Sequence, residues 1–190
     1  MIFDRRVLIF LATNFLLLQL MLLVNSGITF AAINLFILGP ACIFPALYLR
    51  ADHFFVTAII TGLWIDAALP SLFGIMTVLI PTIGTLILLT RRRFRAEKNF
   101  HPCLLAHLAN FTLVLAIIYT LILEGASSYN LVIIQSIELA LSHLILLFVA
   151  PWFFNLQRLL FRISDSKTEP ESLPFIWADM DNYDVKKRDN

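Results

Sequence analysis

Charged residues are scarce in this chain of 190 residues: Asp, Glu, Lys and Arg make up 14% of it, whereas hydrophobic residues make up 59%. The mean hydropathy is +0.85. A soluble domain carries about 25% charged and about 45 to 50% apolar residues, so this composition excludes a soluble globular enzyme. The shortage is greatest in residues 7–90, which contain three Asp, Glu, Lys or Arg residues, and in 103–157, which contain two. These two stretches are predicted to lie in a lipid bilayer.

Cysteine pairs and catalytic motifs are also lacking. Cys42 and Cys103 lie inside apolar runs without CxxC spacing, which gives no indication of a disulfide framework or a metal site. The histidines show neither H-x-x-x-H spacing nor a carboxylate at ligand spacing. No nucleophile elbow, Walker loop or pair of catalytic acids is present. We therefore expect no enzymatic activity, no cofactor and no metal, and the net charge of +1 gives no sign of a nucleic-acid partner.

The apolar stretches divide into six segments at polar or turn-forming breaks. A membrane-spanning helix needs about 20 mostly apolar residues. Segments of suitable length lie at residues 7–24, 28–49, 54–69, 73–90, 103–123 and 131–154, of which the third is short for a span. The chain is thus predicted to be an all-α membrane protein with six transmembrane helices in one domain, residues 1–162.

Basic residues indicate the orientation of this domain, because Lys and Arg near span ends are retained in the cytoplasm. With six spans, every basic residue that flanks a span falls on one side: Arg5, Arg6, Arg50, Arg91, Arg92, Arg93, Arg95, Lys98, Arg158 and Arg162. The three loops on the other side contain none. The N- and C-termini are therefore both expected in the cytoplasm.

Residues 163–190 differ in composition from the spans. They contain seven acidic and four basic residues and a Pro-containing stretch that does not suit a helix interior. This composition predicts a disordered cytoplasmic tail. The apolar cluster at 175–177 leaves open a short motif that folds on a partner.

Asp66 is an acidic residue within a predicted span, where a carboxylate is costly unless it finds partners. Gly62 lies four residues earlier, so the two residues share one helix face, and glycine allows a neighbouring backbone to come close. One interpretation is a proton or cation site. The other is a buried packing or helix-capping residue, which the absence of a second carboxylate or a basic residue in a neighbouring span favours.

A polar stripe runs along the predicted sixth span. Gln135, Glu138 and Ser142 are spaced three and four residues apart, which places them on one face of a helix. His107 and Asn110 form a similar, weaker pair in the fifth span. Such groups should face protein or water, and either hydrogen bonding between helices or the lining of a ligand cavity explains them.

Small residues and prolines mark two other spans. The fourth span carries small residues down one side, a pattern typical of close helix packing: Gly74, Thr77, Pro81 and Gly84. In the second span, Gly39, Pro40 and Pro45 are predicted to kink or break the helix. Broken helices occur both in transporter sites and in scaffolds, so this break does not decide the function.

Two groups of motifs are shared with a known membrane-protein family. The first is Gly62-Leu-Trp-Ile-Asp66 with Pro70, Gly74, the small-residue span and the basic loop 91–95. The second is the end of the sixth span, where Pro151-Trp-Phe-Phe154 precedes Arg158. Over roughly residues 7–162 the chain resembles the rod shape-determining MreD family. The candidate packing or partner-binding residues are Gly62, Asp66, Gly74, Gly84, Gln135, Glu138, Ser142, Pro151 and Arg158.

The resemblance implies a non-catalytic component of the bacterial inner membrane that serves cell shape and peptidoglycan elongation. The implied partners are an MreC-type scaffold and, through it, the MreB filament, a RodA-type glycosyltransferase and a penicillin-binding transpeptidase. The implied fold is similar to the S-components of energy-coupling-factor transporters, which leaves open capture of a vitamin-sized molecule. Capture requires polar loops that close over a ligand, whereas the external loops here are short, so the scaffold function is favoured.

Overall fold

The computed structural model describes residues 5–28, 33–69, 73–90, 100–123 and 129–165. Within these ranges the chain forms six α-helices and no strand: α1 (Arg5–Ile28), α2 (Pro40–Tyr48), α3 (Ala51–Ala68), α4 (Ile75–Thr90), α5 (Phe100–Leu123) and α6 (Tyr129–Asp165). The prediction of an all-α chain is confirmed for these residues. By length and composition, α1, α5 and α6 are suited to cross a membrane. The predicted tail lies almost wholly outside the described residues, beyond Asp165.

The second predicted span, residues 28–49, is helical in its second part alone. Residues 33–39, which we call the non-helical segment, precede α2, and α2 begins at Pro40. A proline suits the first turn of a helix because its missing N–H would have no partner there. The break expected at Gly39 and Pro40 is confirmed, and α2 continues through Pro45 to Tyr48.

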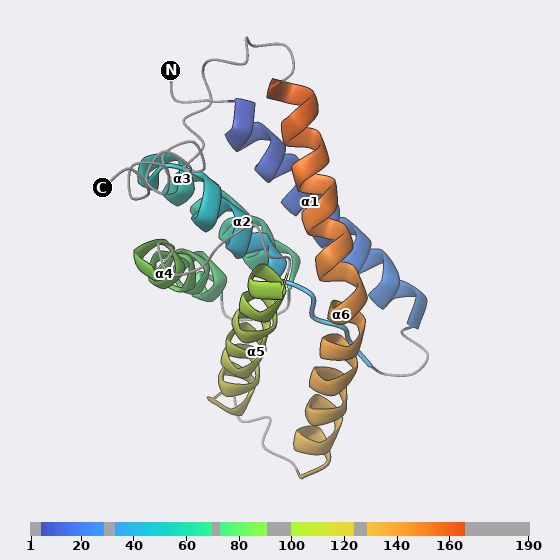
Figure 1. Ribbon diagram of the computed structural model, residues 1–190. Helices are drawn as coiled ribbons and strands as arrows, with labels where there is room; N and C mark the ends of the chain where they lie inside the picture. The colour runs from blue at the N-terminus through green and yellow to red at the C-terminus, as the bar shows by residue number, and fades with distance from the viewer. Residues whose placement is uncertain (1–4, 29–32, 70–72, 91–99, 124–128, 166–190) are drawn as a thin grey trace, which may run out of the picture.

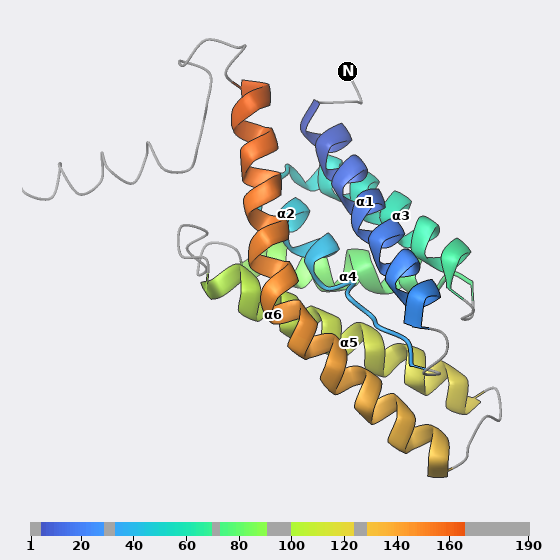
Figure 2. The same ribbon diagram turned by 90° about the vertical axis from the view of Figure 1, so that its right-hand side faces the viewer.

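The long helix α6 contains a proline but does not end at it. Pro151 lies inside α6, and Figure 2 shows the helix changing direction near its middle. A proline removes one helical hydrogen bond and bends the axis. The helix continues past the expected end of the span at Phe154 to Asp165. In Figures 1 and 2, the N-terminal half of α6 lies beside α5.

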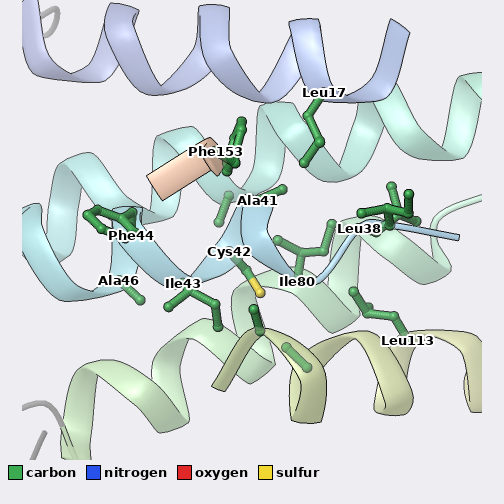
Figure 3. Packing of buried hydrophobic residues seen from close by; sticks show 14 of the residues in the cluster. Leu17, Leu38, Ala41, Cys42, Ile43, Phe44, Ala46, Ile80, Leu113 and Phe153 are labelled. Carbon is green, nitrogen blue, oxygen red and sulfur yellow. The ribbon is translucent and has the colours of Figure 1, made fainter. Parts of the chain in front are cut away.

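The short helix α2 lies at the centre of the hydrophobic core. Its residues from Pro40 to Leu47 are all buried. Figure 3 shows the side chains of α2 surrounded by residues from four other helices: Leu17 of α1, Ile80 of α4, Leu113 of α5 and Phe153 of α6. Because α2 is enclosed by protein, the longer helices form the outer surface, where many large apolar side chains are exposed.

Candidate functional site

The carboxyl group of Asp66 binds the first turn of α4. Its Oδ1 accepts the backbone N–H of Met76 at 2.9 Å, and its Oδ2 accepts both the backbone N–H of Thr77 at 2.9 Å and the Thr77 hydroxyl at 2.5 Å. The first N–H groups of a helix have no partner within the helix, and a negative charge there interacts favourably with the helix dipole. This geometry corresponds to the capping interpretation of Asp66.

Gly62 lies one turn before Asp66 and lets α4 approach α3 closely. A Cβ atom on Gly62 would lie 2.6 Å from Thr77 Cα and 2.8 Å from the carbonyl oxygen of Met76. Both are backbone atoms, so a larger residue would force the two helices apart. The face that Gly62 and Asp66 share is therefore the face of α3 that contacts α4. We call Gly62, Asp66, Met76 and Thr77 the Asp66 corner.

Gly84 and Gly74, both predicted on the small-residue face of the fourth span, have different roles. Gly84 is buried against the ring of Phe54, and a Cβ atom there would lie 2.6 Å from Phe54 Cε2. Gly74 precedes α4 with φ of 101°, a left-handed conformation that favours glycine, and a Cβ atom there would meet nothing within 4 Å. Gly84 thus packs on α3, whereas Gly74 serves the turn that leads into α4.

The second group of polar residues surrounds the non-helical segment. Every backbone N–H from Asn34 to Gly39 donates to a side chain of one of the surrounding helices. The acceptors are Glu138 Oε1 for Asn34 (2.6 Å), Asn25 Oδ1 for Leu35 (2.8 Å), Ser142 Oγ for Phe36 (2.9 Å), Met21 Sδ for Ile37 (3.5 Å), and Asn110 Oδ1 for Leu38 (2.9 Å) and Gly39 (3.1 Å). We call these five acceptor residues the polar cradle.

The polar cradle explains how a non-helical backbone is tolerated in an apolar protein. In lipid each unsatisfied backbone group costs several kcal/mol, so irregular backbone occurs where protein groups satisfy it. Asn25 satisfies both backbone groups of Leu35, since its Nδ2 also donates to the Leu35 carbonyl at 3.0 Å. The stripe of Glu138 and Ser142 therefore bonds to the backbone of a non-helical segment, and not to another helix.

Asn14 of α1 likewise satisfies a backbone group, one that the proline inside α2 leaves without a donor. Because Pro45 has no N–H, the carbonyl of Ala41, four residues earlier, lacks its usual helical donor. Asn14 Nδ2 donates to this carbonyl at 2.9 Å and to Thr61 Oγ1 at 3.1 Å. One amide thus links α1, α2 and α3 and supplies the hydrogen bond that the proline removes.

His107 of α5 and His143 of α6 form a contact that their spacing did not predict. Their Nδ1 atoms lie 2.9 Å apart, so one ring donates and the other accepts. The ring centroids are 5.2 Å apart, and the two Nε2 atoms are buried without a hydrogen-bond partner. Among the described residues, no group of three or more His, Cys, Asp or Glu is placed to hold a metal ion. The pair therefore acts as a bond between two helices.

The remaining predicted residues lie in the C-terminal half of α6. Pro151 lies inside α6, and the guanidinium carbon of Arg158 lies 5.6 Å from the centre of the Phe44 ring. This cation–π contact joins the end of α6 to the central helix α2. Gln135, at the other end of the polar stripe, has a buried Oε1 atom without a hydrogen-bond partner.

Asn14, Asn25 and Met21 were not identified from the sequence as binding residues. A signal existed for Asn14, which is one of two amide side chains, with Gln19, in the apolar first span. The break at Gly39 and Pro40 was a second signal, because a broken span leaves backbone N–H groups that require acceptors. No local pattern indicated which side chains would supply them.

Comparison with known proteins identifies the family. The family model for the rod shape-determining protein MreD matches residues 2–160, which include both the Asp66 corner and the polar cradle. No curated protein and no solved structure matches the chain at a significant level. Since the matched region covers most of the 190 residues, the resemblance noted in the sequence is confirmed, and the chain belongs to the MreD family of rod shape-determining membrane proteins.

Proposed function

We propose that this chain is a non-catalytic, multi-pass component of the bacterial inner membrane that scaffolds the proteins of the cell-wall elongation complex. Membership of the MreD family gives it a role in determining rod shape. The scaffolding role is supported by the groups to which the polar side chains of this chain bond. These side chains hold the chain's own backbone, and the outer surface that contacts lipid and partners is apolar.

The supporting observation is clearest in the polar cradle. A subunit that captures a small molecule directs polar side chains at the ligand. Here Asn25, Asn110, Glu138 and Ser142 direct their oxygen atoms at the non-helical segment, and Asp66 directs both oxygens at α4. These groups stabilise the fold, so recognition of partners falls to close packing of apolar helix faces.

The direct partner that the family resemblance implies is an MreC-type scaffold. Through it, the chain would act on the MreB filament, a RodA-type glycosyltransferase and a penicillin-binding transpeptidase. Each of these contacts is part of the proposal. In the proposed topology both termini lie in the cytoplasm, because ten basic residues flank the six predicted spans on that side.

We place the partner helix on the outward side of α6. In the most apolar part of α6, 22% of the residues are buried, against 44% in α1 and in α5. Leu144, Leu147, Phe148 and Trp152 are exposed and lie on one face, because they are spaced three, one and four residues apart. A stripe of this kind suits packing against a second helix within the membrane.

A photo-crosslinking residue at Phe148 tests this surface in cells that carry a tagged MreC-type partner. Phe148 is 75% exposed, and Leu23 of α1, at 69%, is the matched control position. We expect a covalent adduct with the partner from position 148 and none from position 23. An adduct from position 23 alone would move the surface to α1, and adducts with lipid alone at both positions would contradict the scaffold proposal.

The six-span topology has its own test. A periplasm-active reporter fused after Asn190 should be silent, because that end is placed in the cytoplasm. Strong activity of the fusion would contradict the proposed orientation.

Capture of a vitamin-sized molecule is the second candidate function. It is supported by unpartnered buried atoms beside the non-helical segment, Glu138 Oε2 and Asn110 Nδ2. The family resemblance also implies a fold similar to that of transporter S-components. Purified protein without partners should bind no vitamin-sized molecule if the scaffold proposal is right. Tight binding that Glu138→Ala removes would establish capture in its place.

A further inference from the structure

Glu138 is a buried carboxyl group with an unequal hydrogen-bond environment. The residue is 1% exposed. Its Oε1 accepts the backbone N–H of Asn34 at 2.6 Å and lies 3.5 Å from Asn34 Nδ2. Its Oε2 is buried and has no hydrogen-bond partner. All the hydrogen bonds of this carboxyl group therefore fall on one oxygen.

An ionised carboxylate does not suit this environment. It accepts hydrogen bonds at both oxygens and donates none, and an unpaired charge in an apolar interior costs several kcal/mol. A carboxylic acid has one accepting oxygen and one O–H donor. The observed pattern, with one oxygen that accepts and one that does not, matches the acid.

An acceptor on the same face of α6 also lacks a donor. Gln135 lies one helical turn before Glu138 on the same face of α6, and its buried Oε1 is an acceptor without a partner. A single proton on Glu138 Oε2 gives this acceptor a donor and removes the charge. Two unsatisfied atoms are thereby explained by one proton.

No charge near Glu138 offers a different explanation within the described part of the chain. The titratable side chains described on the helices that contact α6 are Arg5 and Arg6 of α1, Cys42 and Tyr48 of α2, and Cys103, His107 and Tyr119 of α5. In the described ranges, the side-chain hydrogen bonds of Glu138 go to Asn34. On α6 itself, His143 is bonded to His107, and Arg158 and Arg162 lie 20 and 24 residues beyond Glu138, about 30 Å or more along the helix. A metal ion is not indicated either, because no group of three or more ligand side chains is found among these residues.

We infer that Glu138 is a proton-binding site of the folded protein, a carboxylic acid that accepts the Asn34 N–H with Oε1 and donates its O–H from Oε2 towards Gln135. The proton keeps the junction between α6 and the non-helical segment neutral. In an unfolded chain Glu ionises near pH 4.3, so unfolding at neutral pH releases this proton. Rising pH therefore favours unfolding of the wild-type protein. Glu138→Gln, which carries no proton to release, lacks this part of the pH dependence.

Infrared spectroscopy of the purified full-length protein at pH 7.5 tests the inference. A protonated carboxyl group gives a C=O band separate from those of carboxylates, and a carboxyl group in water is ionised at this pH. We expect such a band in the wild-type protein and in Asp66→Asn, and its loss in Glu138→Gln. A band that persists in Glu138→Gln, or no band in the wild-type protein, would overturn the inference and would indicate that the Gln135 amide is turned to donate to a carboxylate.

A second measurement keeps the test valid if Glu138→Gln is poorly folded. Wild-type protein labelled with ¹³C on glutamate side-chain carboxyl carbons should show the band shifted, and protein labelled on aspartate carboxyl carbons should not. A shift with the aspartate label alone would assign the proton to an aspartate and contradict the inference. Neither result depends on the proposed partners, so the scaffold proposal and this inference fail separately.

Discussion

Asp66 and Glu138 are two buried carboxyl groups with opposite surroundings. Asp66 receives three hydrogen bonds, shared between its two oxygens, at the N-terminus of α4. Glu138 receives its hydrogen bonds on one oxygen, from Asn34 of the non-helical segment. The surroundings of Asp66 suit a negative charge, whereas those of Glu138 suit a neutral acid. An acidic residue in an apolar helix is therefore to be interpreted from the donors around it.

The regions around the two residues also differ in the backbone that their polar groups satisfy. In the Asp66 corner, the polar group stabilises the end of a regular helix, and a glycine brings the two helices together. In the polar cradle, polar side chains from three helices replace the hydrogen bonds that residues 34–39 would have made in a helix. Both regions use polar groups to satisfy backbone atoms, and that use underlies the scaffold proposal.

The largest effect is expected from closing the space at Gly62. Gly62→Leu places side-chain atoms where the backbone of Thr77 lies, 2.6 Å from the position of the new Cβ atom. Overpacking costs about 1 to 3 kcal/mol where side chains yield, and backbone atoms yield less, so we expect a loss of about 3 kcal/mol or more. Folded protein recovered from membranes should fall sharply. Gly27→Leu is the control, because a Cβ atom on Gly27 meets nothing within 4 Å.

The next largest effect is expected from removing the acceptor at position 66. Asp66→Leu leaves two backbone N–H groups and one hydroxyl without their partner, at a cost of about 3 kcal/mol. Thermal unfolding in detergent can be followed by a thiol-reactive dye, because the free thiol of Cys42 is buried and becomes reactive on unfolding. The measurement is best made in a Cys103→Ser background. An unfolding temperature equal to that of the parent protein would show that Asp66 does not cap α4.

Within the polar cradle, Asn110 is expected to matter more than Ser142. Asn110→Leu leaves the N–H groups of Leu38 and Gly39 unpaired, at about 2 kcal/mol, whereas Ser142→Ala leaves that of Phe36, at about 1 kcal/mol. Hydrogen exchange should be faster at the backbone groups named for each variant. Unchanged exchange there would mean that other groups satisfy the non-helical segment.

The smallest effect is expected from Glu138→Gln at pH 7. The amide accepts from Asn34 with its oxygen and donates to Gln135 with its nitrogen, as the protonated acid does, so the change in stability should stay below about 0.5 kcal/mol. Raising the pH from 7 to 9 should lower the unfolding temperature of the wild-type protein more than that of the variant. An equal pH dependence in the two proteins would contradict a proton held at Glu138.

Features that depend on local sequence were predicted well. Composition predicted the all-α chain, Gly39 and Pro40 predicted the break, and the spacing of Gly62 and Asp66 predicted a shared face. These follow from residues close together in the chain. The six-span count and the orientation depend on the position of the membrane and stay predictions.

The partners of the polar residues could not be predicted in the same way. Glu138 and Asn34 are separated by 104 residues, and Ser142 and Phe36 by 106. The spacing of the stripe predicts that its members face inward, but not that they meet a non-helical backbone. Likewise, α2 contacts all five other helices, an arrangement that no single span predicts.

The contrast between Asp66 and Glu138 is tested most directly by replacing each residue with its amide and comparing the two variants in one experiment. Asp66→Asn turns an amide N–H₂ group towards donors, so it should lower the free energy of unfolding by about 1 to 2 kcal/mol at pH 7. Glu138→Gln should change it by less than about 0.5 kcal/mol, because it reproduces the donor and acceptor of the acid. The account predicts this inequality in dye-monitored unfolding of the two full-length variants. Equal losses, or a greater loss for Glu138→Gln, would contradict it.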